Sequence, residues 1–454
     1  MPALPPLPTL PINPEDARHL AWLDSIQGNM VKGHGREFTR LLFFSFQRTA
    51  PENLLLLPAA VAAKRVTSGG EQYRQARSGR RDAPFYSLGF TEEFFWACRF
   101  SRAFPPGHDA FQAGMKSRLL QIRGEPETEQ QWDWVYRKVP HGMWLLAHAQ
   151  HAKLDEMQRE VVNLLTQHRA ALLGTVEEGR RWSDDAGGKL IREPFGFRDG
   201  LSQMDFFAPP AAAPAHVRVD LDRVVMTEGV HAGGSFLVLR KLDQNVKAFR
   251  DFEAAMAGAY RKHGTGLPAR EAGALLVGRE RDGTPLAELA SARPNDFDFQ
   301  KDGTAARCPF HAHIRKANPR TDDPAATDRG IPHRDAQFVR RSAVYDEAGR
   351  LPRRASERYA GGETITGGVG LLFMGYMRDI QAQFERMQLQ WFSDPDFPVR
   401  GAGLADPLIR GAVAGAPDWR WNGVTVPGLA KFVNSRGGAY FYMPSMAWLS
   451  KPAA

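Results

Sequence analysis

The chain has 454 residues, of which 43% are hydrophobic and 24% charged, and this balance excludes disorder over most of its length. Lys and Arg (59) outnumber Asp and Glu (51), which gives a formal charge of +8, but the basic residues are interspersed and form no strip suited to nucleic acid. The two cysteines, Cys98 and Cys308, lie too far apart in sequence to indicate a Cys-x-x-Cys metal site or a disulfide framework. We therefore expect a folded protein of a reducing compartment, without a nucleic-acid partner.

The N-terminal segment is rich in proline and has no basic residue before Arg18. It lacks the charged start and the unbroken apolar run of a secretory signal, so we expect residues 1–15 to form an extended arm. The longest apolar stretch, residues 54–63, contains a proline and is shorter than the ~20 residues that a membrane helix requires. The sequence thus predicts a cytoplasmic protein with no membrane partner, and it leaves the formation of a homo-oligomer open.

The first half of the chain predicts strands followed by a long helix. A continuous apolar run at residues 40–46 has the length of a buried strand, residues 86–90 end a second strand, and residues 132–148 predict further strand. Apolar residues at helical spacing predict a helix over residues 154–173. Residues 177–190 are charged and contain glycine, which is typical of a boundary between two units.

The second half repeats this order of elements. Residues 235–240 predict a strand, residues 245–261 a helix, residues 370–376 another strand and residues 380–392 another helix. A chain of this length exceeds the usual limit of one hydrophobic core, so two units are expected. No regular alternation of strand and helix is found, which favours an α+β fold over a doubly wound sheet.

Two segments carry groups suited to chemistry on iron. Cys-Pro-Phe-His-Ala-His-Ile-Arg-Lys-Ala-Asn-Pro-Arg at residues 308–320 supplies imidazoles, and Gly-Phe-Arg-Asp-Gly at residues 196–200 supplies a carboxylate in a turn flanked by glycine. A haem that cleaves a peroxide bond needs an imidazole on one face to hold the metal and a group on the other face to move a proton. Each segment alone is weak evidence for such a site, because Asp-Gly is also an ordinary turn dipeptide and a lone histidine is more often a polar loop residue.

Together these segments resemble the signatures of the dye-decolorizing peroxidases. Four further segments are similar to parts of that family in the same order, namely residues 26–36, 234–242, 277–286 and 370–376. The resemblance covers nearly the whole chain after the arm, and the long loops look most like the larger, fungal and cyanobacterial members.

This resemblance implies two ferredoxin-like domains with mostly antiparallel sheets and peripheral helices, at residues 16–185 and 190–454. It also implies one haem b (iron protoporphyrin IX) per chain, held by the second domain near the domain interface. The implied activity is the oxidation of dyes, phenols and other aromatic donors in one-electron steps, at the expense of hydrogen peroxide.

The same resemblance assigns residues to roles on the two faces of the haem. It selects His313 as the iron ligand, because the family motif ends in His-Ile-Arg-Lys, whereas the residues alone leave His311 and His313 nearly even. It implies that Asp199 moves the proton on the opposite face. It also implies that Asp379 accepts a hydrogen bond from the ligand ring, and the rival interpretation of Asp379 is the N-cap of the helix that follows.

Two arginines complete the expected site. Arg315 is expected to pair with a haem propionate, although a single Arg is more often a surface residue. The second cation stabilises charge on the departing oxygen, and Arg suits this role because it stays protonated. Arg340 is expected in this role, because the segment around it fits the family better than that around Arg329, although Ser342 and Asp346 stand where glycines are expected.

Two other functions compete with the peroxidase hypothesis. A haem carrier or sensor would use the same fold without turnover, and it would not oxidise a dye repeatedly after peroxide is added. A basic nucleic-acid-binding module would bind DNA or RNA in a salt-sensitive manner and would show no haem absorption.

Overall fold

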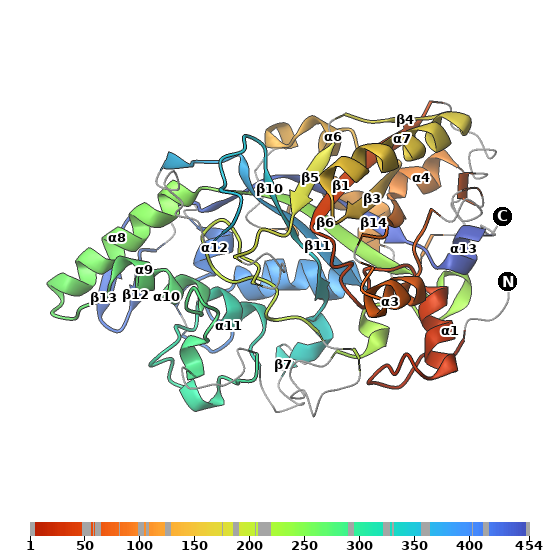
Figure 1. The fold of residues 1–454 in the computed structure, drawn as a ribbon. Helices are drawn as coiled ribbons and strands as arrows, with labels where there is room; N and C mark the ends of the chain where they lie inside the picture. The colour runs from red at the N-terminus through yellow and green to blue at the C-terminus, as the bar shows by residue number, and fades with distance from the viewer. Residues whose placement is uncertain are drawn as a thin grey trace.

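The computed structural model of the protein describes residues 5–47, 56–57, 59, 65–80, 82–98, 104–105, 109–122, 129–174, 176–184, 190–204, 206–207, 219–288, 295–320, 327–328, 331–355, 364–401, 403–411 and 417–450. A large antiparallel sheet dominates these residues, and helices cover it (Figure 1). The fold is therefore α+β, as the sequence predicts.

The main sheet has ten strands, and its strands come from both halves of the chain. The first half supplies β1 (Phe38–Phe46), β2 (Phe85–Phe90), β3 (Gly142–His148), β4 (Ala170–Leu172) and β5 (Glu177–Arg180). The second half supplies β6 (Ser235–Gln244), β9 (Val339–Arg340), β10 (Ala343–Asp346), β11 (Val369–Met377) and β14 (Val433–Met443). Two small hairpins stand apart, formed by β7 (Thr327–Asp328) with β8 (Ile331–Pro332) and by β12 (Trp419–Trp421) with β13 (Val424–Val426).

The strands of the main sheet close into a ring. The order is β10-β5-β1-β3-β2-β14-β6-β11, and β11 pairs with β10 again. Within each half the pairings are long, as between β6 and β11. The two seams between the halves are short, because β2 meets β14 through the pair Phe90 and Tyr442, and β5 meets β10 through Arg180 and Val344. Each half thus forms its own antiparallel sheet, and the two sheets join edge to edge.

Helices lie on the outside of this ring. They are α1 (Ala17–Ser25), α3 (Gly69–Arg77), α4 (Glu92–Ala97), α5 (Asp109–Ser117), α6 (Trp134–Arg137), α7 (His151–Gln167), α8 (Val246–Lys262), α9 (Ala269–Ala272), α10 (Ala274–Val277), α11 (His313–Ala317), α12 (Pro407–Arg410) and α13 (Met446–Ser450). A helix with wide π-type turns follows β11 as η10 (Ile380–Glu385) and η11 (Met387–Phe392). Figure 1 shows α7 above β1 and β3, and α8 at the end away from α1 and α13. Among the described residues, no helix has the length and apolar character needed to cross a membrane.

Most of the predicted elements are confirmed. The strands expected at residues 40–46, 86–90, 235–240 and 370–376 are β1, β2, β6 and β11, and the helix expected at 245–261 is α8, with Asn245 as its N-cap. The helix expected to reach residue 173 ends at Gln167, because Arg169 takes a positive φ of 56° and the chain turns into β4. The strand predicted over residues 132–148 is wrong in its first part, where Trp134–Arg137 is helical.

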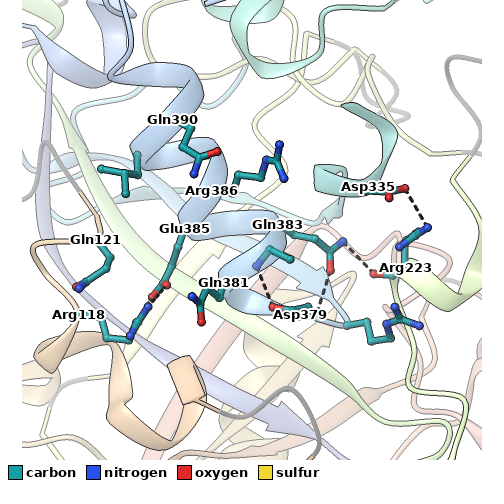
Figure 2. Close-up of a pocket in the computed structure, with 13 residues that line it drawn as sticks. Arg118, Gln121, Arg223, Asp335, Asp379, Gln381, Gln383, Glu385, Arg386 and Gln390 are labelled. Carbon is teal, nitrogen blue, oxygen red and sulfur yellow. Dashed lines mark hydrogen bonds and ion pairs between the residues drawn. The ribbon is translucent and has the colours of Figure 1, made fainter. Parts of the chain in front are cut away.

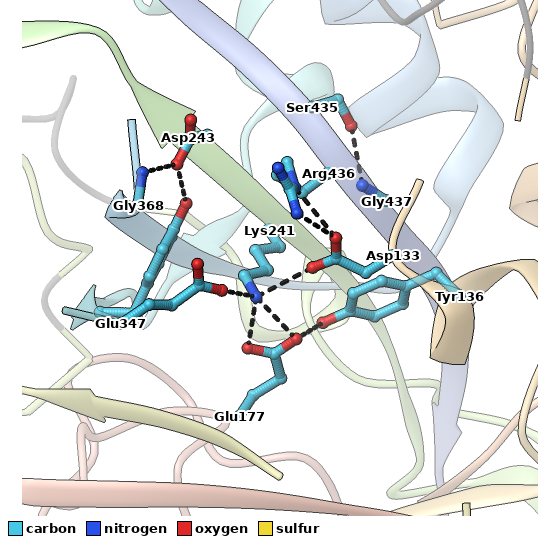
Figure 3. A network of polar contacts seen from close by, with 11 residues as sticks. Asp133, Tyr136, Glu177, Lys241, Asp243, Glu347, Gly368, Ser435, Arg436 and Gly437 are labelled. Atoms are coloured by element: carbon cyan, nitrogen blue, oxygen red, sulfur yellow. Dashed lines mark hydrogen bonds and ion pairs between the residues drawn. The ribbon is translucent and has the colours of Figure 1, made fainter. Parts of the chain in front are cut away.

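A buried lysine ties the two halves together through charge (Figure 3). Lys241 of β6 is 4% exposed, and its Nζ lies 2.9 Å from carboxylate oxygens of Asp133 and Glu177 and 2.5 Å from Glu347. Burial lowers the pKa of Lys241, but the three carboxylates, with Glu177 foremost, raise it by more, so the net shift is upward. Arg436 also binds Asp133, at 2.6 Å. Asp133 and Glu177 belong to the first half and their basic partners to the second.

Candidate active site

One cavity of about 250 Å³ brings together residues that are far apart in the sequence. Its wall includes His313, Asp199 and Arg340, three of the five residues expected at the site. Most of the remaining wall is apolar and is supplied by Phe195, Phe197, Leu242, Leu371, Phe373, Phe384, Met387, Phe392 and Leu408. A largely apolar cavity with a few polar groups is the usual form of a cofactor or substrate site.

His313 is the first residue of α11, and one of its ring nitrogens has a firm partner. Its Nδ1 lies 2.7 Å from Oδ2 of Asp406, and its ring stacks on Phe392 with centroids 5.5 Å apart. No hydrogen bond to Nε2 is found among the described residues, and the side chain is 26% exposed at the cavity. Nε2 is therefore the nitrogen free to bind a metal.

Asp406 serves two structural purposes at once. It is fully buried and is the N-cap of α12, where its Oδ1 accepts hydrogen bonds from the backbone N–H groups of Leu408 (2.8 Å) and Ile409 (3.1 Å). Its Oδ2 accepts from His313 Nδ1. This fixes the ring orientation and the tautomer with the proton on Nδ1, and a carboxylate in this position makes the ring a stronger metal ligand.

The expectation that Asp379 accepts from the ligand ring is wrong. Asp379 is the N-cap of η10, where its Oδ1 accepts from the N–H of Ala382 at 2.9 Å, so the rival interpretation is confirmed. Figure 2 shows its carboxylate in a separate polar pocket, beside Gln383 and near Arg223. The capping geometry turns the carboxylate towards the helix backbone, and His313 is paired with Asp406 instead.

The expectation for Arg315 is also wrong, since this residue does not line the cavity. Two residues after His313 on a helix, its side chain points about 200° away around the axis. Its guanidinium donates to Asp302 Oδ2 (3.0 Å) and to the carbonyl of Cys308 (2.7 Å), between the rings of Phe299 and Phe310. Arg315 therefore holds the loop in front of α11.

Two other buried arginines line the cavity, and their charges would be stabilised by a negatively charged ligand. Arg279 and Arg320 both donate to Oγ of Ser202, at 3.1 and 3.2 Å. Burial, together with the charge of Arg279, lowers the pKa of Arg320 to about 9, and burial with the charge of Arg340 lowers the pKa of Arg279 to about 10. Carboxylates placed here would relieve both effects. Both residues lie in segments that resemble the family, but sequence reasoning singled out neither.

Asp199 lies in a turn that depends on glycine. Gly196 and Gly200 have φ values of 93° and 74°, in the left-handed region that favours glycine. The backbone N–H of Asp199 donates to the carbonyl of Ile191 at 2.9 Å, and the N–H of Gly200 donates to Asp199 Oδ1 at 2.6 Å. Among the described residues no partner of Oδ2 is found, so this oxygen remains able to take up a proton.

Arg340 ends the short strand β9, which pairs with Gly375 of β11 at the edge of the cavity. No hydrogen bond from its guanidinium is found among the described residues. The rival, Arg329, lies outside the described residues.

His311 does not line the cavity. It is 2% exposed and packs against Trp419 with ring centroids 5.7 Å apart. Burial lowers its pKa to about 3, so its ring is neutral.

These residues fit an iron porphyrin. His313 offers a free Nε2 whose opposite nitrogen is anchored on a carboxylate, and the cavity wall beside it is mainly apolar, as a porphyrin ring requires. Arg279 and Arg320 offer buried positive charge for two carboxylates.

Comparison with known proteins places these features in context. The chain is 30% identical over 466 residues to the multifunctional dye peroxidase DyP2 of an Amycolatopsis species, covering 94% of this chain and 95% of that protein. It is 31% identical over 389 residues to a dye-decolorizing peroxidase of Mycetinis scorodonius, covering 74% and 70%. The structure matches the crystal structure of a DyP-type peroxidase from Anabaena with a TM-score of 0.80 and 28% identity, over 99% of each chain. No family model matches the chain.

Proposed function

Because the chain belongs to the family of dye-decolorizing peroxidases, whose members are haem enzymes with this α+β, ferredoxin-like fold, we propose that it binds one haem b through His313. The protein is an oxidoreductase that uses hydrogen peroxide to oxidise aromatic donors. The residues lining the cavity all fall between residues 193 and 433, which supports residues 190–454 as the haem-binding unit and residues 16–185 as its partner domain.

One observation carries this proposal. The anchored imidazole of His313, the carboxylate of Asp199 and the guanidinium of Arg340 meet in a single, mainly apolar cavity. Arg279 and Arg320 take the place expected of Arg315, as the cations that hold the haem propionates. A haem carrier or sensor has no use for a proton-transferring acid and a charge-stabilising cation beside its cofactor, and the relatives reported above are named peroxidases.

Haem, when bound, would supply the electrons that break the O–O bond of hydrogen peroxide, which is the oxidant, and would hold the oxidising equivalents until they are passed to the donors. The protein's own residues control protons and charge. Asp199 takes a proton from one oxygen of hydrogen peroxide and returns it to the other, which leaves as water. Arg340 stabilises the negative charge that develops on the departing oxygen, and its fixed protonation suits that role. Two one-electron donors, phenols or aromatic dyes, then supply the electrons for each peroxide consumed.

The test is a matched pair of histidine variants. We expect the wild-type protein, supplied with hemin, to bind it stoichiometrically and to oxidise a dye repeatedly when hydrogen peroxide is added. His313→Ala should lose stoichiometric haem binding, because no other imidazole lines the cavity in the part of the chain that the structure describes. His311→Ala, which removes a buried ring outside the cavity, should keep both haem and turnover. Haem retention in His313→Ala with haem loss in His311→Ala would move the ligand to His311.

A further inference from the structure

The turn that carries Asp199 is built around a second carboxylate, that of Glu193. We propose that Glu193 is a positioning residue for Asp199, whose carboxylate fixes the backbone from which Asp199 reaches the cavity. This inference rests on the proposed function, in which Asp199 transfers a proton and therefore loses activity when its carboxylate is displaced. Its test must therefore separate the role of Glu193 from that of Asp199.

Residues 191–199 form a small hairpin. Arg192 and Arg198 pair across it, the N–H of Asp199 donates to the carbonyl of Ile191, and the N–H of Gly196 closes the tip by donating to the carbonyl of Glu193 at 2.7 Å. Asp199 is thus on the returning arm, opposite the start of the hairpin. A shift of the backbone at the tip would therefore displace the arm that carries Asp199.

The carboxylate of Glu193 fills the inside of the tip. Its Oε2 accepts from the N–H of Phe195 at 2.9 Å, and its Oε1 accepts from the N–H of Phe197 at 2.8 Å. Gln244 of β6 donates to Oε2 as well, at 2.7 Å. The carboxylate therefore satisfies two backbone donors of the turn and joins the turn to the sheet, while both Glu193 and Gln244 line the same cavity as Asp199.

The carbonyl groups of the same turn are held by arginines. Arg250 of α8 donates to the carbonyl of Phe195 at 2.7 Å, and Arg281 binds the same oxygen. Arg192 donates to the carbonyl of Gly196 at 2.8 Å. A Cβ at Gly196 would come within 2.7 Å of Arg281 Nη1, so this cation approaches the turn as closely as glycine allows. The arginines thus hold carbonyl groups of the turn, and the carboxylate of Glu193 holds the N–H groups of Phe195 and Phe197.

Glutamine cannot replace Glu193 in this position. The two backbone N–H groups need one acceptor oxygen each, and the side-chain amide of glutamine has a single oxygen. Its NH2 group would face one of the two N–H donors, so the tip would have to open. A misplacement of about 1 Å at a catalytic group can cost about 100-fold in rate.

The experiment is a double-mutant cycle on haem-loaded full-length protein, with the rate of the first spectral change after mixing with hydrogen peroxide as its readout. Asp199→Asn alone should slow this step by at least 100-fold. Glu193→Gln alone should slow it by about 10- to 100-fold, at unchanged haem content. In the Asp199→Asn background, Glu193→Gln should slow it by less than about 2-fold, because its effect passes through Asp199.

Two further variants distinguish displacement of Asp199 from misfolding and from the general effect of changing a buried carboxylate. Gln244→Met removes one donor to Glu193 but keeps the backbone bonds, so we expect a milder slowing, about 2- to 10-fold, that is again absent in the Asp199→Asn background. Glu92→Gln is the matched control, because Glu92 is a buried carboxylate of α4 outside the cavity, and its rate should stay within about 2-fold of wild type.

The outcomes separate the two claims. An unchanged rate in Asp199→Asn would overturn the proposed function of Asp199 and with it this inference. A large loss in Asp199→Asn, with no loss in Glu193→Gln and Gln244→Met, would overturn the role of Glu193 alone. Equal slowing by Glu193→Gln in both backgrounds would also overturn it, since the residue would then act without Asp199.

Discussion

The pair of His313 and Asp406 gives the sharpest test of the haem site. Asp406→Asn keeps the shape of the side chain but replaces one of its two acceptor oxygens with an NH2 donor. The carboxylate now serves three donors, His313 Nδ1 at 2.7 Å and the N–H groups of Leu408 and Ile409 at 2.8 and 3.1 Å. A single oxygen cannot serve both the ring and the helix, so the variant must give up one of them.

Either arrangement weakens the metal ligand. If the oxygen keeps the cap of α12, the NH2 group faces Nδ1 and favours the tautomer that carries its proton on Nε2, the nitrogen needed for iron. If the oxygen keeps the ring, the helix loses a cap worth about 1 kcal/mol, and a charge-assisted hydrogen bond becomes a neutral one, at a further cost of about 1 kcal/mol. Losses of such partners typically lower metal affinity or activity by about 10- to 100-fold, or about 1.4–2.8 kcal/mol.

The assay is hemin titration of Asp406→Asn followed by a redox titration. We expect haem affinity to fall by about 10- to 100-fold and the midpoint potential of the bound iron to rise, because the ring donates less electron density to the ferric state. Asp379→Asn is the matched control, since asparagine keeps the oxygen that caps η10 and the change leaves His313 and Asp406 in place. Unchanged haem affinity and potential in Asp406→Asn would refute the reasoning, as would equal effects in both variants.

Two further predictions concern the distal cation and the seam between the halves. Arg340→Leu should slow the reaction with peroxide by about 100- to 1,000-fold at unchanged haem content, because removal of one charge-stabilising donor has an effect of this size in other enzymes. Stopped-flow absorbance measures this rate. A loss of that size in Arg329→Leu, with none in Arg340→Leu, would assign the role to Arg329 instead. Lys241→Met should lower the free energy of unfolding by about 3–5 kcal/mol, because it leaves the buried carboxylates of Glu177 and Asp133 without their cation. Lys247→Met, which breaks the exposed pair with Asp251, should cost at most about 1 kcal/mol in the same urea titration, and equal losses would contradict the argument.

Local patterns in the sequence predicted what depends on neighbours along the chain. The buried strands β1 and β11 and the helix α8 follow from apolar runs and periodicity, and the motifs around His313 and Asp199 are short enough to be recognised directly. The helix α6 was not predicted because Trp132, Asp133 and Trp134 alternate apolar and polar residues as a strand does. In the structure Asp133 pairs with Lys241 and Arg436 of the other half.

Groups that depend on distant parts of the chain could not be found in this way. Asp406 lies 93 residues after His313, and the sequence Asp-Pro-Leu that contains it reads as an ordinary helix start, which it also is. Asp379 has the same local signature, so only the packing of α11 against α12 decides between them. The prediction for Arg315 failed for a different reason. Arg315 is two residues from His313 in sequence, and on a helix this spacing places it on the opposite side of α11.

The short seams of the ring have a consequence for how the protein folds. Within the ring, strand pairing joins the halves at two residue pairs, and the rest of their contact includes a shared hydrophobic core and the buried charges around Lys241. A piece cut at residues 185–190 would leave β2 and β5 as open edges and Glu177 as a buried charge without its cation. We therefore expect neither piece to be stable alone, and the intact chain to melt in one cooperative transition.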